Sequence, residues 1–414
     1  MNTLLQSVTL HEKAHQLHNK IVDIRISQGV ITRIGERLKI EASDSVIPLD
    51  GTYVSYGWFD PEVSFSQPGY EHKGLLENDL NEAALVGIAS IGLMSNTLPR
   101  PDSGSALSFY KGFSTHPVSL HPFGCLTLKN KGEELAELFD LFDQGALAFY
   151  DYKKPILEAN LMKLALQYSQ NFGGRLAVFC QDPSLSKGGQ VRESASTITL
   201  GLKAIPNLSE ELAVQQSIAL LRYAGGKLHL CGISSCASIA LIEQAKKEGL
   251  DLSCSVGVGL LYFDEEVLQN FDSRYKTLPG LTDSTHRKAL IKAVKSGVID
   301  YVTADHQNVS AEEKDTEFSE ASFGNRALSA LFPALCDIFG VVEASDLLKR
   351  AYQTYGLGNV EIKEQSQAHL SFYKPLDHTI IEKEPQTHLF HGVSFSYRGI
   401  GIFANNQLVL STAP

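Results

Sequence analysis

The chain has 414 residues, of which 43% are hydrophobic and 20% are charged, and its formal net charge is −11. This composition is typical of a globular protein with a large hydrophobic core. The acidic balance argues against nonspecific nucleic-acid binding, which needs Lys and Arg to neutralise phosphates, and against a polybasic membrane-binding surface.

The N-terminal segment is not expected to be a signal peptide, because no basic stretch precedes an apolar core. No apolar run in the sequence reaches the ~20 residues that span a bilayer. The six cysteines are scattered and form no Cys-x-x-Cys pair. This favours buried free thiols over a zinc site built from cysteines. We therefore expect a cytoplasmic protein without a membrane or nucleic-acid partner.

Both ends of the chain have a β-strand pattern. Ile21–Ser27 alternates polar and apolar side chains, and Gln28-Gly29 supplies a turn into the next strand. Strand-like segments return beyond residue 357, where Asn405-Asn406 has the character of a hairpin tip. These ends predict one small β-sandwich domain built from residues 1–54 and 357–414.

Residues 55–356 alternate short apolar segments with helical stretches, and the first strand is expected near Tyr56–Phe59. The pattern gives seven to eight strand–helix units, which favours a closed (β/α)8 barrel over an open doubly wound sheet. The doubly wound alternative also lacks a Gly-x-Gly-x-x-Gly turn after its first strand. Helices are expected at Ala83–Ser90, Glu133–Gln144, Ile156–Gly173, Leu208–Ala224, Ser235–Glu248 and Thr285–Ser296.

The segment after the first expected strand carries a specific family resemblance. It contains Asp60-Pro61, Val63 and Pro68–Lys73 in the frame of the dihydroorotase branch of the amidohydrolase superfamily. Asn96-Thr97 continues the match and favours dihydroorotase over allantoinase or hydantoinase. The resemblance spans most of the chain and implies an amidohydrolase-type (β/α)8 TIM barrel. Later matching segments are Ala148–Asp151, Cys180–Asp182, Leu230–Ser234, Ala304–His306 and Ala321–Gly324.

The resemblance implies one or two zinc ions held by a His-x-His pair, a mid-barrel acidic residue or modified lysine, two later histidines and a final aspartate. Only Asp151 and Asp305 match that pattern, and all four lost ligands are imidazoles. Zinc prefers nitrogen and sulfur donors, so we expect no metal and no cofactor, with zinc bound only in an active hydrolase with an altered site. The six positions are Glu62, Ser64, Asp151, Phe179, Gly232 and Asp305.

Two other sets of side chains could replace the lost histidines as metal ligands: the remaining carboxylates and the neighbouring cysteines. The carboxylates of Glu62, Asp151 and Asp305 would suit a hard ion such as Mg²⁺ or Ca²⁺, against a vacated site filled by water or side chains. Cys180 and Cys231 each neighbour a lost histidine. Since adjacent strand residues face opposite ways, we expect both thiols to point away from the barrel mouth.

The substrate-binding positions implied by the resemblance have also changed. The arginine that grips the substrate carboxylate is Ser66 here, and a hydroxyl cannot replace a bidentate guanidinium. Two polar anchors are replaced by Leu278 and Thr282. Asn96 and His306 are kept, either as vestigial substrate-binding residues or as structural ones. Without a metal-bound hydroxide to form, Asp305 is a vestigial base.

The resemblance therefore implies a dihydroorotase-like protein of pyrimidine biosynthesis that is catalytically inactive and serves as a structural or regulatory partner. The candidate partner is aspartate carbamoyltransferase, and a homodimer is the other expected assembly. The alternative is an active cyclic-amide hydrolase that converts dihydroorotate to N-carbamoyl-aspartate. It would use Asp60, Glu62, Asp151 and Asp305 in an altered metal site.

Overall fold

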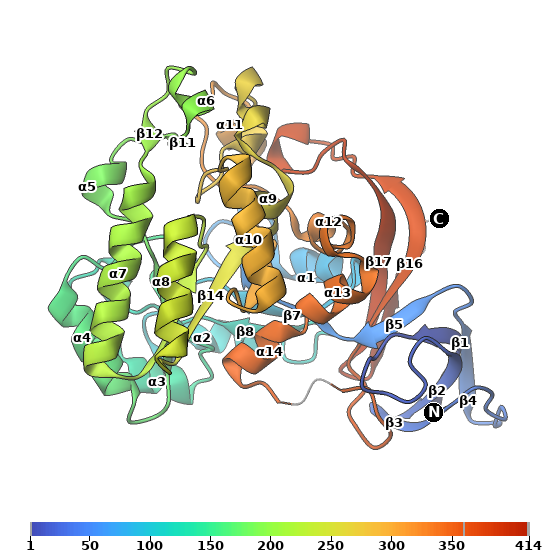
Figure 1. Cartoon of the computed structure of the whole chain (residues 1–414). Coiled ribbons are helices and arrows are strands. Elements are labelled where there is room, and N and C mark those ends of the chain that lie inside the picture. The colour runs from blue at the N-terminus through green and yellow to red at the C-terminus, as the bar shows by residue number, and fades with distance from the viewer. Residues whose placement is uncertain (1, 359–360, 412–414) are drawn as a thin grey trace.

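The structure is a computed structural model that describes residues 2–358 and 361–411. Within these residues, eight parallel strands follow one another in chain order, and helices cover their outer side (Figure 1). The strands are β6 (Trp58–Val63), β7 (Ile88–Leu93), β8 (Ser119–Pro122), β9 (Phe149–Tyr150), β10 (Arg175–Phe179), β13 (Lys227–Cys231), β14 (Leu252–Gly257) and β15 (Tyr301–Thr303).

The eight strands form two parallel ladders that meet at two seams. One ladder contains β6 to β8, and the other runs from β9 to β15. A bridge between Gly124 and Phe149 joins them on one side, and a bridge between Ser64 and Gln307 joins them on the other. The Asp60 carboxylate supports the second seam, because it accepts hydrogen bonds from the Thr303 hydroxyl at 2.6 Å and the Ala304 amide at 2.9 Å. This arrangement confirms the predicted (β/α)8 amidohydrolase-type barrel.

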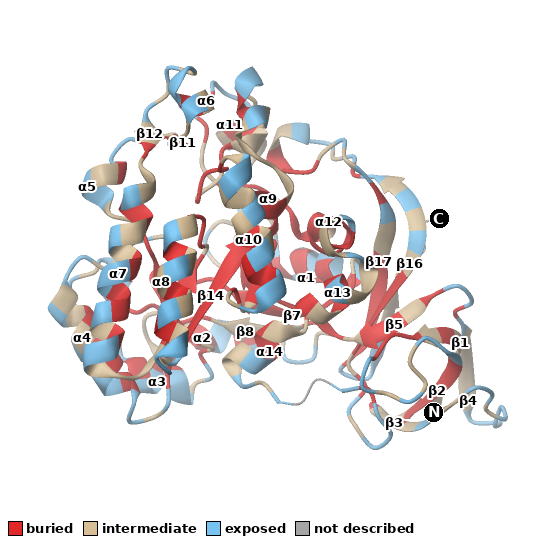
Figure 2. Cartoon of the chain, in the orientation of Figure 1, coloured by how far each residue is buried: buried red, intermediate tan, exposed pale blue. Residues whose placement is uncertain are grey.

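The helices of the barrel are amphipathic, and Figure 2 shows their buried sides facing the strands. In α10, for example, Leu290, Ala293 and Val294 are buried at helical spacing. The main helices are α1 (Leu76–Leu85), α2 (Gly104–Lys111), α3 (Leu138–Asp143), α4 (Ala159–Ser169), α7 (Asn207–Ala224), α8 (Cys236–Lys247), α10 (Ser284–Ser296) and α12 (Leu331–Phe339). Short additional elements are α5 (Pro183–Ser186), β11 (Val191–Arg192), α6 (Ala195–Ile198), β12 (Ala204–Ile205), α9 (Val258–Tyr262), α11 (Ala311–Lys314), α13 (Val341–Leu347) and α14 (Arg350–Tyr355).

The two chain ends build one sheet beside the barrel, as predicted (Figure 1). Its order is β18-β17-β16-β5-β1-β2-β3, and β4 pairs with β1. The domain boundaries drawn from the sequence, at residues 54 and 357, stay a prediction. The strands are β1 (Asn2–Leu10), β2 (Ile21–Ser27), β3 (Val30–Gly35), β4 (Asp44–Pro48), β5 (Tyr53–Tyr56), β16 (Leu370–Thr379), β17 (Ser394–Ala404) and β18 (Gln407–Leu410).

Four aromatic side chains form a partly exposed group on the helical side of the barrel, called here the Phe172 cluster. The rings of Phe139, Phe142 and Tyr168 lie 5.6, 5.1 and 5.5 Å from the ring of Phe172. Phe139 is 54% exposed and Tyr168 is 45% exposed. Since Phe172 comes just before β10 begins, the cluster lies at the end of the barrel opposite the carboxyl ends of the strands.

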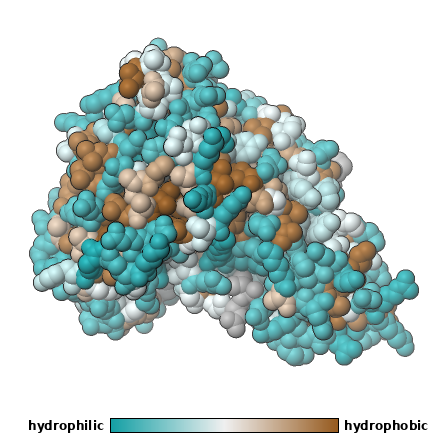
Figure 3. Space-filling view, in the orientation of Figure 1, coloured by the Kyte–Doolittle hydropathy of each residue, from teal (hydrophilic) through white to brown (hydrophobic). Residues whose placement is uncertain are grey.

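Apolar patches interrupt the hydrophilic surface over the helices in the view of Figure 3. Among the helices of the described residues, none combines the length and the apolar character that crossing a membrane would need.

Candidate functional site at the carboxyl ends of the strands

Function in a (β/α)8 barrel resides where the strands end, and the six positions named above lie at or near those ends. Glu62 lies on β6 and is buried, and Ser64 follows the end of that strand. The Ser64 hydroxyl accepts a hydrogen bond of 2.7 Å from the Asn96 side-chain amide. Asn96, expected to contact substrate, therefore contacts the position of a lost ligand.

Asp151 follows β9, and its carboxylate is occupied by neighbouring donors. It accepts hydrogen bonds from the Leu126 amide at 2.9 Å, the Thr127 amide at 3.0 Å, and the Thr127 hydroxyl. Burial raises the pKa of Asp151, although these hydrogen bonds oppose that shift. The carboxylate thus fastens the loop after β8 to the end of β9.

The two positions without a donor side chain differ in their surroundings. Phe179, at the end of β10, is 5% exposed and packs in an apolar cluster with Tyr150 and Cys231. Gly232 has a φ of +67°, and a Cβ there would lie 3.2 Å from the Pro279 side chain. A histidine at position 232 would therefore meet both an unfavourable backbone conformation and a close neighbour.

Asp305 forms an ion pair with Lys153, a residue that the sequence did not single out. The Lys153 ammonium lies 2.8 Å from one carboxylate oxygen of Asp305 and 2.9 Å from the other. Burial alone would lower the pKa of Lys153, but the Asp305 carboxylate raises it overall. The Lys153 ammonium therefore lies against the two Asp305 oxygens that would otherwise bind a metal ion.

His306 is buried, and both of its ring nitrogens have partners. Nδ1 accepts hydrogen bonds of 3.2 Å from the Ala327 and Leu328 amides, and Nε2 lies 3.0 Å from the Asn308 side-chain oxygen. Burial lowers the pKa of His306 to about 4, so the ring is neutral at physiological pH.

A cavity of about 340 Å³ lies beside the strand ends and is lined by Asn96 and Ser66, among other residues. Ser66 stands where the family pattern has the arginine that binds the substrate carboxylate. The cationic residues that line the cavity are Lys73, Arg100 and Lys154. Lys73 pairs with Glu313 at 2.6 Å, and Lys154 donates to the Asn130 carbonyl at 3.1 Å. The cavity is thus polar, but two of its three cations are already engaged by the chain.

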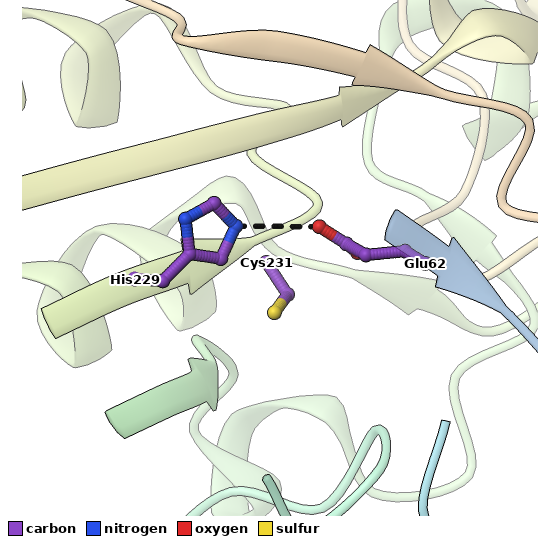
Figure 4. A group of neighbouring side chains, drawn as sticks. All are labelled: Glu62, His229 and Cys231. Atoms are coloured by element: carbon purple, nitrogen blue, oxygen red, sulfur yellow. Dashed lines mark hydrogen bonds and ion pairs between the residues drawn. The ribbon is translucent and has the colours of Figure 1, made fainter. Parts of the chain in front are cut away.

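Deeper in the barrel, Glu62 lies beside two residues of β13, as Figure 4 shows. The ligand atoms of Glu62, His229 and Cys231 all lie within 4.8 Å of one another, and all three residues are buried. Glu62 Oε1 is 3.3 Å from His229 Nε2 and accepts a hydrogen bond of 2.8 Å from the Tyr301 hydroxyl. Burial alone would raise the pKa of Glu62, but its hydrogen bonds to His229, Ser255 and Tyr301 lower it.

The prediction that no metal or cofactor is expected is contradicted by this group. A carboxylate, an imidazole and a thiol within 4.8 Å of one another are a set of donors that could hold a metal ion. The prediction considered the six positions at the strand ends, where four imidazoles are lost, and it set aside Cys231 as pointing away from the barrel mouth. It overlooked His229, because that histidine matches none of those positions.

The expected orientation of the two cysteines is correct for Cys180 and wrong for Cys231. The Cys180 thiol lies 3.9 Å from the Ser217 hydroxyl of α7, on the helical side. Cys231 shares the inner face of β13 with His229, two residues earlier. The prediction assumed that Cys231 and Gly232 are adjacent residues of one strand and so face opposite ways. Strand β13 ends at Cys231, and Gly232 has a left-handed backbone, so this assumption does not hold.

The family's zinc centre does not fit the six positions as the structure places them. Asp151 is bound by backbone donors, Asp305 by Lys153, and Ser64 by Asn96. Among the residues that the structure describes, Asp151 and Asp305 belong to no group of three metal-ligating side chains. The all-carboxylate site considered for a hard ion is therefore not assembled, and no hydrolytic step is derived through a metal at these positions.

Comparisons with known proteins agree with the fold described above. The family model described as "Dihydro-orotase-like" matches residues 53–238. A dihydroorotase of Acetivibrio thermocellus is 33% identical over 76% of this chain and 74% of its own length. The dihydroorotase of Bacillus subtilis is 31% identical over 91% of this chain and 90% of its own length.

Solved structures show the same fold at lower sequence identity. An L-hydantoinase from Arthrobacter aurescens superposes with a TM-score of 0.84 at 18% identity, covering 100% of this chain and 96% of its own. A D-hydantoinase from a Thermus species gives a TM-score of 0.81 at 18% identity, covering 99% of this chain and 95% of its own. At this identity the likeness concerns the fold alone. The two dihydroorotases, at 33% and 31% identity over 76% and 91% of this chain, show that the chain belongs to the dihydroorotase family.

Proposed function

We propose that this chain is a dihydroorotase homologue of pyrimidine biosynthesis that does not hydrolyse dihydroorotate. The observation that carries the proposal is the ion pair of 2.8 Å between Lys153 and Asp305. In the family pattern, this aspartate is the final metal ligand and the proton-shuttling base. Here the Lys153 ammonium contacts both carboxylate oxygens, so neither oxygen is free to bind a metal ion or to contact a metal-bound water.

The other strand-end residues support the same conclusion. Phe179 and Gly232 offer no donor atom, and Asp151 already accepts three hydrogen bonds. Ser66 cannot make the bidentate contact that an arginine makes with a carboxylate. Both the activation of water and the grip on the substrate are therefore weakened.

We further propose that the chain acts in the cytoplasm as a structural or regulatory partner of aspartate carbamoyltransferase. The retained barrel and the exposed Phe172 cluster support an interaction role, since contiguous exposed aromatic side chains are typical of protein contacts. The cluster lies at the opposite end of the barrel from the strand-end residues. A partner bound there would leave those residues uncovered.

Co-purification from the native cell tests the partnership. Tagged native chain is expected to retain aspartate carbamoyltransferase, and Phe139→Glu is expected to release it by placing a charge in the Phe172 cluster. Ile381→Glu is the matched control, since Ile381 is also an exposed apolar residue, at 72%, but belongs to the C-terminal part of the chain. Absence of the transferase from the native sample, with its activity unchanged in cells lacking this chain, would refute the partnership.

The alternative is an active cyclic-amide hydrolase with an altered metal site. The observation that favours it is the group of Glu62, His229 and Cys231, which could hold a metal ion inside the barrel. Turnover of dihydroorotate by zinc-supplemented protein distinguishes the two functions. Turnover above a protein-free blank would establish the alternative.

A further inference from the structure

The strands bring Glu62, His229 and Cys231 together from opposite parts of the barrel. His229 and Cys231 are two residues apart on β13, so their side chains leave the strand on the same face. Glu62 comes from β6, which is not a neighbour of β13 in either ladder. Figure 4 shows the imidazole and the carboxylate pointing toward each other, with Cys231 beside them. The group therefore spans the inside of the barrel.

The distances within the group are close to those of a metal site. Zinc bonds of about 2.0–2.3 Å at tetrahedral angles place neighbouring donor atoms roughly 3.3–3.6 Å apart. The three donor atoms lie within 4.8 Å of one another, and Glu62 Oε1 and His229 Nε2 are already 3.3 Å apart. Separations of up to 4.8 Å would have to shorten by roughly 1 Å for all three atoms to bind one ion.

The surrounding hydrogen bonds orient the donors as they do around bound metals. His229 Nδ1 lies 2.8 Å from the Ser253 hydroxyl, which leaves Nε2 directed at Glu62. A hydrogen bond at the second ring nitrogen fixes the tautomer of metal-binding histidines in this way. The Tyr301 hydroxyl lies 2.9 Å from His229 Nε2 and 2.8 Å from Glu62 Oε1, so its oxygen is a fourth polar atom beside the three donors.

We propose that Glu62, His229 and Cys231 bind one zinc ion inside the barrel. One thiolate, one imidazole and one carboxylate favour zinc or a similar borderline divalent ion over Mg²⁺ or Ca²⁺. The site is closed: His229 is 0% exposed, Cys231 3% and Glu62 7%. The ion therefore has a structural role, joining β6 to β13. This site uses one position of the family's centre and two residues outside it.

Cobalt(II) binding by the full-length chain tests the site directly. The chain is unfolded with a chelator, refolded with cobalt(II), and examined for the thiolate-to-cobalt charge-transfer band in the near ultraviolet. Wild type is expected to show the band and to saturate at one ion per chain. Cys231→Ser is expected to lose the band and to bind at least about tenfold more weakly. Cys180→Ser is the matched control, because Cys180 is also buried at a strand end but lies beside α7.

Two results would overturn the site. One is a wild-type chain that refolds, as judged by circular dichroism, and shows no charge-transfer band. The other is a band that survives in Cys231→Ser. If Cys231→Ser fails to refold, His229→Gln replaces it and is expected to shift the band and weaken binding to the same extent, whereas unchanged spectra would contradict the proposal. None of these readouts depends on turnover, so failure of the metal site and failure of the proposed function are distinguishable.

Discussion

Asp151 and Asp305 are the two family ligands that this chain keeps, and both have acquired structural contacts. Asp151 ties the loop after β8 to β9, and Asp305 is paired with Lys153. A carboxylate whose oxygens are bound by the chain's own donors stabilises the fold and has fewer free lone pairs for a metal ion. The identity of a residue is therefore a weaker guide to its role than its contacts.

Replacing Lys153 by methionine tests how strongly Asp305 depends on its partner. The side chains of Lys153 and Asp305 are 13% and 24% exposed, so removal of the ammonium leaves a mostly buried carboxylate without its counter-charge. We expect Lys153→Met to reduce the free energy of unfolding by about 2 kcal/mol in urea denaturation.

The double variant Lys153→Met/Asp305→Asn should recover at least half of that loss, because it removes both charges. Lys247→Met is the control, since its pair with Glu243 is exposed and should contribute little. If Lys153→Met and Lys247→Met have the same free energy of unfolding, the Lys153–Asp305 pair does not stabilise the fold more than an exposed pair does.

The sequence located the six strand-end positions, because their spacing within the family frame is local information. It could not predict that Lys153 pairs with Asp305 or that His229 faces Glu62. These partners are separated by 152 and 167 residues, so only closure of the barrel brings them together. The prediction of no metal failed for this reason.

Helix α10 illustrates how local signals define an element. Asp283 precedes the helix, and its carboxylate accepts hydrogen bonds from the Thr285 amide at 2.8 Å and the His286 amide at 3.0 Å. Gly297 ends the helix with a φ of +78°. An aspartate at the N-cap and a left-handed glycine at the end are both readable from sequence, and the predicted helix starts one residue from the observed one.

Asp283→Ala is expected to lower the free energy of unfolding by about 1 kcal/mol, because two amides at the start of α10 lose their acceptor. Lys288→Ala, at an exposed position in the middle of the same helix, should change stability by less than about 0.5 kcal/mol. Thermal unfolding of the two variants gives the comparison. A smaller loss for Asp283→Ala than for Lys288→Ala would contradict the capping role.

Elements with weaker local signals were predicted less well. Strand β8, Ser119–Pro122, is not predicted from the sequence, because it has only four residues and ends in proline. The first barrel helix was placed at Ala83–Ser90, whereas α1 spans Leu76–Leu85 and residues 88–90 already belong to β7. An uninterrupted apolar run does not show where a helix gives way to a buried strand, so this boundary depends on tertiary packing.

At the scale of the whole molecule, buried histidines make stability depend on pH. Each is harder to protonate in the folded chain than in the unfolded chain, where the pKa is about 6.5. The unfolded chain therefore binds more protons as the pH falls from about 6.5 to 4, and the folded chain loses stability over that range. Burial lowers the pKa to about 4 for His11, His121, His306 and His369, and to about 3 for His388.

Asp60 and Asp79 act in the opposite direction, because burial raises their pKa to about 6 and the folded chain then binds protons more readily. Burial also raises the pKa of Glu82, Asp151, Asp305, Asp337 and Glu382. We expect the five imidazoles, whose pKa values fall from 6.5 to about 4 or below, to outweigh these carboxyl groups. The free energy of unfolding is therefore expected to fall by at least about 2 kcal/mol between pH 7 and pH 5, measured by urea denaturation. A constant or rising value would show that these histidines are not kept neutral by burial.

The barrel and the sheet from both chain ends are the parts of the molecule that sequence patterns predicted best. Both are predicted from the alternation of strand and helix patterns over hundreds of residues, so an error at one element boundary does not change the predicted fold. The chemical properties of the site depend on a few contacts across the barrel, such as that of Lys153 with Asp305, so one missed contact changes the predicted function. Family membership therefore leaves the activity of this chain as a separate question.

That question is answered most directly by steady-state hydrolysis of dihydroorotate, measured on the full-length chain supplemented with zinc. The Bacillus subtilis dihydroorotase serves as the positive control under the same conditions. We expect no turnover above the protein-free blank, whether or not zinc is bound. Turnover above the blank would contradict the proposed function, and its loss in Asp305→Asn would show that Asp305 acts as a base despite its ion pair with Lys153.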